Sequence, residues 1–298
     1  MDRIFVTGGA RFIGSHFIEH VIKKGYKVLN YHVLTYSANL NNLKTQIDVL
    51  GVEFVKGDIR DHTSVTDTSL RFKPNYVVNF AAESHVDISI SNPKTVSDVN
   101  INGTIILLEC FKHYLTTLSA KVSPKFIQIS TDEVCGARGI GNAATKNSMV
   151  KPSNPYSASK ASAELMAISY FKTYQVPILI TRCCNNYGPR QNKEKLIPKI
   201  LHNFKNRSPM PIYGDGKQIR QWLHVKDHAT ALLKIMKYGD IGRIYNIGGE
   251  DLIPNIKLFE IIAKIYKKIP KQDNLDASLL LQFVSDRPGH DLRSSDLE

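Results

Sequence analysis

The first 180 residues alternate between short runs rich in β-branched residues and longer segments whose apolar positions recur with helical spacing. The strand-like runs cover residues 3–8, 26–31, 52–58, 75–82, 125–131 and 176–182, and the helical segments include 12–24, 95–114 and 156–174. Strands that alternate with helices build a parallel sheet with helices on both faces. We therefore expect an α/β protein with a doubly wound parallel sheet, whose ligands lie at the carboxyl edge of the strands.

The pattern becomes irregular after about residue 185, with turns at "YGPRQN" and "YGDGKQ". A further strand-like run at 244–249 and a helical segment at 256–268 follow. We predict a larger, Rossmann-like domain made of residues 1–184 plus about 218–247. The remaining residues, 185–217 plus 248–298, are expected to form a smaller C-terminal domain.

Composition and charge exclude several classes of protein. The 298 residues contain no apolar run of the roughly 20 residues that a membrane span needs, and no signal-peptide core, so we expect a cytoplasmic protein without a membrane span. The four cysteines lack metal-ligand spacing, so we expect no metal site. The net charge of +12 comes from scattered lysines and arginines. This pattern favours a solvated surface or a phosphate-bearing small substrate over nucleic acid.

The stretch "VTGGARFIGS" places Gly8, Gly9 and Gly14 between the first strand-like run and the first helical segment. Glycines allow a tight turn and a close approach of backbone amides to a pyrophosphate, and the start of the helix adds partial positive charge. The position favours a dinucleotide-binding turn over a purely structural one. Two residues are unusual, because Arg11 stands where a third glycine is typical and His32 where an acid usually holds the adenosine ribose.

"NPYSASKA" places Tyr156 and Lys160 four residues apart on one face of a helix, where a cation beside a phenol favours a general base. "QISTDEVCG" ends a strand-like run with Thr131, Asp132 and Glu133, which brings two carboxyl groups to the same edge of the sheet. Adjacent carboxyl groups suit one acid and one base, although a helix N-cap is an alternative explanation. The combination with the glycine turn favours catalysis.

Nine motifs occur in order along nearly the whole chain: "TGGARFIG", "DIRD", "NFAAESHVD", "ISTDEV", "NPYSASKA", "TRCCNNYGP", "EKLIPK", "YGDGKQIR" and "DRPGHD". Together they resemble those of the dTDP-glucose 4,6-dehydratases, in the extended short-chain dehydrogenase/reductase superfamily. The resemblance implies a lyase that oxidises the sugar at C4, eliminates water across C5 and C6, and returns hydride to C6. It also implies that the larger domain binds a dinucleotide and the smaller domain binds a nucleotide sugar.

The resemblance assigns a role to each catalytic residue. Tyr156 would take the proton of the 4-hydroxyl group, while Lys160 lowers the pKa of Tyr156 and orients the nicotinamide ribose. Glu133 would remove the C5 proton, and Asp132 would protonate the departing 6-hydroxyl group. Thr131 would hydrogen-bond the sugar near C4.

Two sets of binding residues complete the expected site. The dinucleotide set is Gly8, Arg11, Phe12, Ile13, Gly14, His32, Asp58, Ile59, Ala81, Ala82, Tyr156, Lys160 and Asn186. The substrate set is Ser84, Thr131, Asn185, Lys195, Leu196, Ile197, Pro198, Tyr213, Arg220, Asn255, Arg287 and His290, with Arg220 and Arg287 as phosphate partners. The family further implies NAD as cofactor and a homodimer formed through the helical segments 95–114 and 156–174.

Several positions depart from the family pattern, and they leave alternatives open. Besides Arg11 and His32, the departures are Val33, Ile88, Val99, Cys135, Arg190, Gln221 and Ser294. Arg11 and the lost acid at position 32 leave NADP possible. A UDP-sugar dehydratase, epimerase or decarboxylase of the same superfamily is one alternative, although related epimerases lack the acid pair. A degenerate paralogue that binds a nucleotide sugar without turnover is the other.

Overall fold

The computed structural model describes residues 1–35, 38–119, 122–137, 144–270, 276–286 and 288–291. A seven-stranded sheet with parallel pairings runs through its larger part, in the order β10-β6-β5-β4-β1-β2-β3. The strands are β1 (Arg3–Thr7), β2 (Lys27–His32), β3 (Glu53–Lys56), β4 (Tyr76–Asn79), β5 (Lys125–Thr131), β6 (Ile178–Cys183) and β10 (Ile244–Ile247). The predicted doubly wound sheet is confirmed.

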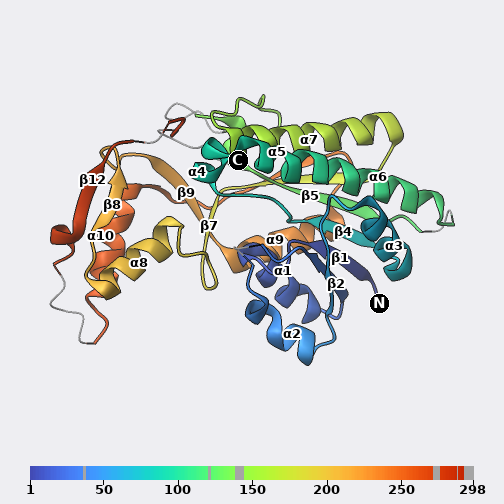
Figure 1. Ribbon diagram of the computed structural model, residues 1–298, viewed down its shortest axis with the longest axis horizontal. Helices are drawn as coiled ribbons and strands as arrows, with labels where there is room; N and C mark the ends of the chain where they lie inside the picture. Colours follow the sequence, from blue (N-terminus) through green and yellow to red (C-terminus); the bar gives the residue numbers. More distant parts are fainter. Residues whose placement is uncertain (36–37, 120–121, 138–143, 271–275, 287, 292–298) are drawn as a thin grey trace.

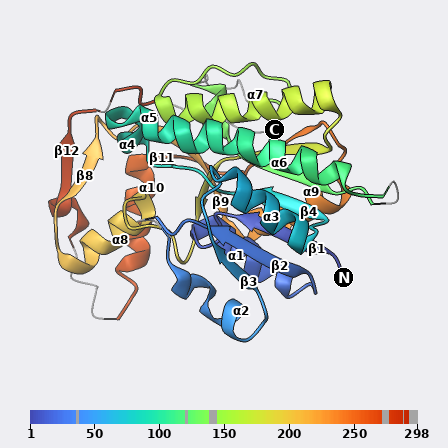
Figure 2. The ribbon, with the colours of Figure 1, turned by 45° about the vertical axis from the view of Figure 1, so that its right-hand side comes forward.

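Helices cover both faces of this sheet (Figures 1 and 2). One layer contains α3 (His62–Phe72), α6 (Gly103–Thr116) and α7 (Pro155–Tyr174), and the other contains α1 (Phe12–Ile22), α9 (Val225–Tyr238) and the short α2 (Lys44–Asp48). Each layer encloses an apolar core. Phe111 packs on Phe126 in the first, and Ile18 and Met236 are buried in the second. Burial of both faces explains why the strand-like runs are almost continuously apolar.

The start of α7 is fixed by its own sequence. Asn154 accepts a hydrogen bond from the Ser157 backbone N–H at 2.9 Å, and Ser157 Oγ is paired with the Asn154 N–H at 3.2 Å. Pro155 occupies the first helical position, where its lack of an N–H group has no cost. This capping box places Tyr156 in the first turn of the helix.

The predicted helix over 95–114 is wrong in one respect, because it is interrupted. The structure has α4 (Val86–Ser91), α5 (Pro93–Ser97), a π-helical turn (Asp98–Asn102) and then α6. The turn directs Asn100 inward, where its Nδ2 donates to the Glu83 carbonyl at 3.0 Å and to Ser159 Oγ at 2.8 Å. These bonds join the loop after β4 to α7, and they account for the local departure from α-helical spacing.

A smaller lobe lies to the left of the sheet in Figure 1. It contains α8 (Leu196–Asn206), α10 (Asn255–Tyr266) and the parallel pair β8 (Met210–Tyr213) and β12 (Leu281–Val284), around a core that includes Phe204 and Phe259. A three-stranded sheet of β7 (Asn185–Tyr187), β9 (Ile219–His224) and β11 (Leu252–Pro254) connects this lobe to the larger part. Short 3-10 helices cover Leu40–Leu43, Asp132–Cys135 and Ala277–Leu280.

Within the described residues, no helix has the length and apolarity needed to cross a membrane. The same part of the chain contains no group of three or more His, Cys, Asp or Glu side chains placed to hold a metal ion. The four cysteines are buried and form no disulfide.

Candidate active site

The glycine turn between β1 and α1 packs directly against the chain that follows β4. Gly8 has a φ of +70°, and a Cβ atom there would lie 2.7 Å from the backbone nitrogen of Ala81. A Cβ on Gly14 would lie 2.8 Å from the Cα of Gly9. Both positions therefore require glycine. Arg11 is the N-cap of α1, and within the described chain its side chain makes no hydrogen bond to the first turn. The backbone N–H groups at the start of α1 are therefore not capped by this side chain.

Arg11 and His32, the two unusual residues near this turn, are both accommodated by the protein. Arg11 Nη1 donates to the Ala82 carbonyl, and Nη2 lies 3.8 Å from Glu83 Oε2. His32 is buried, and its Nδ1 accepts from the Leu34 N–H at 2.7 Å. Burial, with a smaller contribution from Arg11, lowers the pKa of His32 to about 4. Together the two residues therefore add no uncompensated positive charge at neutral pH.

A small cavity of about 70 Å³, the strand-end cavity, opens beside these residues. Asp58 and Arg60 form an ion pair of 2.6 Å in its wall. The cavity is lined by Gly8, Arg11, Tyr31, His32, Val33, Thr35, Gly57, Asp58, Ile59, Arg60, Ala81, Ala82, Glu83 and Val99. Every predicted dinucleotide residue near β2 and β3 therefore lies at this one cavity.

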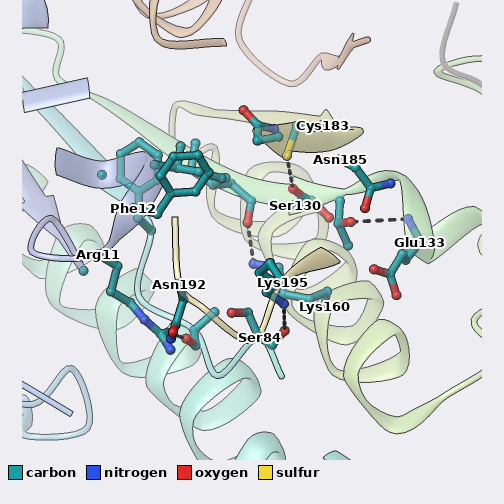
Figure 3. Close-up of a pocket in the computed structure, with 18 of the residues that line it drawn as sticks. Arg11, Phe12, Ser84, Ser130, Glu133, Lys160, Cys183, Asn185, Asn192 and Lys195 are labelled. Atoms are coloured by element: carbon teal, nitrogen blue, oxygen red, sulfur yellow. Dashed lines mark hydrogen bonds between the residues drawn. The ribbon is translucent and has the colours of Figure 1, made fainter. Parts of the chain in front are cut away.

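A larger cavity of about 230 Å³, the central cavity, shares Gly8, Arg11 and Ala82 with the strand-end cavity. Figure 3 shows Arg11 and Asn192 on one side of it, and Glu133, Lys160 and Lys195 on the other. Its lining also contains Phe12, Ile13, Gly14, Phe80, Ser84, Ile129, Ser130, Thr131, Asp132, Tyr156, Cys183, Cys184, Asn185, Asn186, Gln191 and Glu194. The predicted turn, acid pair and Tyr–Lys pair thus meet in one place.

Tyr156 and Lys160 reach the end of β5 from α7. Lys160 Nζ donates to the Ile129 carbonyl at 2.5 Å, and Tyr156 is hydrogen-bonded to Thr131. Burial lowers the pKa of Lys160 to about 8. Burial also raises the pKa of Tyr156 well above its ordinary value, and the negative charge of Glu133 adds to this shift.

In the protein without ligands, burial outweighs any lowering of the Tyr156 pKa by Lys160, so the role expected of Lys160 stays a prediction. Lys160 directs its ammonium group to a backbone carbonyl, and desolvation of the phenol dominates its titration.

The acid pair follows β5 directly. Thr131 caps the 3-10 helix, because its Oγ1 accepts from the Glu133 N–H at 3.4 Å and donates to Asp132 Oδ1 at 3.1 Å. Asp132 is 2% exposed, whereas Glu133 is partly exposed and lines the cavity beside it. The N-cap explanation and the catalytic one are thus compatible, since capping leaves both carboxyl groups at the cavity.

A third cavity of about 290 Å³, the lobe cavity, extends from the central cavity to the smaller lobe and shares Glu133, Asn185, Glu194 and Lys195 with it. Lys195 Nζ donates to the Ser84 carbonyl at 3.1 Å, and Arg220 Nη2 donates to the Asp291 carbonyl at 3.0 Å. The other lining residues are His85, Val86, Asp87, Asn154, Leu196, Lys199, Met210, Pro211, Ile212, Tyr213, Trp222, Asn255, Gly289 and His290.

The sequence matches the family model for GDP-mannose 4,6 dehydratase over residues 5–295. The chain belongs to the GDP-mannose 4,6-dehydratase family. It is 40% identical over 291 residues to the dTDP-glucose 4,6-dehydratase of Xanthomonas campestris pv. campestris (strain B100). The aligned region covers 97% of this chain and 83% of the relative. The resemblance expected from the motifs is confirmed.

Solved structures agree with this family assignment. The dTDP-glucose 4,6-dehydratase of Streptomyces venezuelae, solved with NAD and dTDP bound, superposes with a TM-score of 0.89 at 38% identity, covering 99% of this chain and 88% of its own. The UDP-glucose 4-epimerase of Thermotoga maritima, solved with UDP-glucose, superposes with a TM-score of 0.85 at 28% identity. The match covers 99% of this chain and 89% of the epimerase chain.

The structure brings most of the predicted residues of this dehydratase-family chain to the three cavities. Ile197 and Pro198 lie in the first turn of α8 and do not line them. Arg287 lies outside the described residues. Sequence reasoning missed Glu194, although it precedes Lys195 in the motif "EKLIPK". It also missed Cys183, Cys184, Gln191, Asn192 and Trp222, which carry no spacing signal of their own.

Proposed function

We propose that this protein is a dTDP-glucose 4,6-dehydratase that converts dTDP-glucose to dTDP-4-keto-6-deoxyglucose. The observation that carries this function is the meeting of Tyr156, Lys160, Asp132 and Glu133 at one cavity that continues into a lobe cavity with basic side chains. A cavity with one Tyr–Lys pair and two carboxyl groups contains the groups needed for proton transfer at three sugar positions. The relatives named dTDP-glucose 4,6-dehydratase support the substrate.

NAD fits the central and strand-end cavities. Because positions 8 and 14 are glycines, a diphosphate can approach the backbone of the turn closely. The first turn of α1, which the Arg11 side chain does not cap, supplies N–H groups and partial positive charge for this diphosphate. Asp58, Ile59 and Ala81 line the side of the strand-end cavity, and Asn186 lines the central cavity. The pairing of Arg11 with Glu83 and the neutrality of His32 favour NAD over NADP. When bound, NAD supplies the hydride acceptor for C4 and the hydride donor that C6 later requires.

Tyr156 acts in the first half of the reaction. It lies beside Thr131 at the end of β5, where it takes the proton of the sugar 4-hydroxyl group. Lys160 holds its ammonium in the same wall and stabilises the negative charge that develops on the phenol. Thr131 and Ser84 both line the central cavity, and they hold the sugar near C4.

Glu133 and Asp132 act in the second half. The 4-keto group makes the C5 proton acidic, and the partly exposed Glu133 removes it. Asp132 is buried beside it and gives a proton to the 6-hydroxyl group, which leaves as water.

The lobe cavity binds the nucleotide diphosphate. Lys195 and Arg220 pair with its phosphates, and Tyr213, His290 and Asn185 line its walls. Two buried polar atoms in the cavity lining, Trp222 Nε1 and Asn255 Oδ1, have no hydrogen-bond partner in the described chain. They offer one donor and one acceptor to the nucleotide, in agreement with Asn255 as a substrate residue.

The experiment that tests this function is incubation of the purified protein with a panel of dTDP-glucose, UDP-glucose and UDP-glucuronic acid. We expect the 4-keto-6-deoxy product from dTDP-glucose, detected by its loss of water in the mass spectrum. An epimer or a decarboxylated product from a UDP-sugar would contradict the assignment. Absence of turnover on every substrate, with nucleotide-sugar binding retained, would identify a degenerate paralogue.

Two further features are proposed on the same basis. Residues 1–184 plus about 218–247 form the dinucleotide domain, and 185–217 plus 248–298 form the nucleotide-sugar domain.

A homodimer forms through α6 and α7, where Leu165 is 50% exposed and Tyr174 is 52% exposed. Light scattering should give twice the mass of one chain, and Leu165→Arg should shift the protein to the monomer.

A further inference from the structure

A buried ion pair lies beneath the central cavity and takes no part in the proposed reaction. Glu164 on α7 is 0% exposed and Arg182 on β6 is 2% exposed. Arg182 Nε donates to both Glu164 carboxylate oxygens at 3.1 Å, and its Nη2 donates to Oε1. A buried pair of this kind is a weak source of stability, because desolvation offsets most of the attraction. Its contacts point to another role.

The pair contacts both ends of the segment that carries the acids. Ser130 Oγ donates to Glu164 Oε2 at 2.9 Å, and Ser130 is paired with Arg182 across β5 and β6. Arg182 Nη1 lies 3.5 Å from Cys135 Sγ. Ser130 immediately precedes Thr131, and Cys135 ends the 3-10 helix that contains Asp132 and Glu133. The ion pair therefore holds the acid segment at its start and at its end.

Glu164, the acid of this ion pair, lies on the catalytic helix α7. Glu164 follows Lys160 by one turn of α7, and Lys160 follows Tyr156 by one turn. All three contact β5, because Tyr156 bonds to Thr131, Lys160 to the Ile129 carbonyl and Glu164 to Ser130. One row of three side chains thus sets the position of α7 relative to the strand that leads into the acids.

We propose that Glu164 and Arg182 are positioning residues, which hold the Asp132–Glu133 segment in register with Tyr156 and Lys160. This inference rests on the proposed function. Oxidation at C4 depends on the two residues of α7, whereas elimination also needs the two acids. A loosened segment should therefore slow elimination more than oxidation, since small misplacements of reacting groups are costly.

Three variants separate positioning from folding. Ser130→Ala removes the bond between β5 and Glu164 and leaves the ion pair intact. The double variant Glu164→Leu with Arg182→Met removes both charges together, so that no unpaired charge stays buried. Ser162→Ala is the matched control, because it makes the same chemical change on α7. Within the described part of the chain, Ser162 Oγ bonds only to the Ala158 carbonyl of its own helix.

The measurement is a single turnover of dTDP-glucose in D₂O by each NAD-loaded variant, with thermal melting as a control for folding. We expect Ser130→Ala and the double variant to eliminate water about tenfold more slowly, so that the 4-keto sugar that has not lost water accumulates. Ser162→Ala should match the wild type. A wild-type ratio of dehydrated to undehydrated 4-keto sugar in both test variants would overturn the inference, even if both melt at lower temperature. Failure of the proposed function would instead appear in the wild type itself.

Discussion

Lys160 and Ile129 are joined by a hydrogen bond of 2.5 Å from the ammonium Nζ to the backbone carbonyl. This bond ties the first part of α7 to β5, two residues before Thr131. It also places a cation in a desolvated wall of the central cavity, where its pKa falls to about 8. This one contact therefore fixes the position of α7 against β5 and also holds Lys160 where burial lowers its pKa.

The depressed pKa of Lys160 predicts how stability depends on pH in the protein freed of nucleotide. Between about pH 8 and 10 the unfolded chain keeps the Lys160 proton while the folded chain loses it, so stability should rise with pH. The full shift corresponds to about 3 kcal/mol. The free energy of unfolding of Lys160→Met, measured with denaturant, should lack this rise. If the wild type and Lys160→Met differed in free energy of unfolding by the same amount at every pH between about 8 and 10, this prediction would be contradicted.

Two buried histidines predict a loss of stability in acid. The pKa values of His32 and His228 are lowered to about 4 by burial, so below about pH 6.5 the unfolded chain binds more protons and stability falls until about pH 4. His228→Asn keeps a donor for Asn186 Oδ1, and His32→Asn keeps an acceptor for the Leu34 N–H. In urea unfolding, each variant should reduce the loss of free energy of unfolding between about pH 6.5 and 4 by up to about 3 kcal/mol. If both variants lost as much stability in acid as the wild type, the assignment of this loss to His32 and His228 would be refuted.

The close packing of the glycine turn predicts a strong effect of Gly8→Ala. The new Cβ would lie 2.7 Å from the Ala81 nitrogen, at a φ of +70°. Gly25→Ala is the control, because Gly25 has a φ of +84° but no atom within 4 Å of the new Cβ. We expect both to lose about 1 kcal/mol from backbone strain, and only Gly8→Ala to lose NAD binding as well. Equal NAD affinity of the two variants, measured by calorimetry, would be the contrary result.

The pairing of Arg11 with Glu83 predicts cofactor choice. NAD should be the nucleotide released when the purified protein is denatured, as identified by mass. Glu83→Gln removes the negative partner of Arg11 and should improve NADP binding relative to NAD by about tenfold, because a 2′-phosphate then meets an uncompensated guanidinium. An unchanged ratio of the two affinities would show that Arg11 does not face this phosphate.

The sheet could be predicted because each of its strands is a compact β-branched run bounded by turn residues. β5 begins and ends at the predicted residues, Lys125 and Thr131. The carboxyl-edge rule then placed the acid pair and Tyr156 together, since both follow elements of the same sheet.

The rest depends on contacts between residues far apart in the sequence. The π-helical turn at 98–102 follows from bonds of Asn100 to Glu83 and Ser159, which no local pattern indicates. The partner of Arg11 lies 72 residues away at Glu83. The effect of burial on the pKa of Tyr156 likewise depends on the packed cavity, whereas the four-residue spacing indicates only that Lys160 is near.

Glu133 gives the most direct test of the central claim. The wild type and Glu133→Gln are incubated with dTDP-glucose in D₂O, and the 4-keto-6-deoxy product and its deuterium content are measured by mass spectrometry. The wild type should form this product, and Glu133→Gln should form it at least about a hundredfold more slowly while still binding dTDP. Wild-type rates in Glu133→Gln would contradict the assignment of Glu133 as the base, and no 4-keto-6-deoxy product from the wild type would contradict the proposed function.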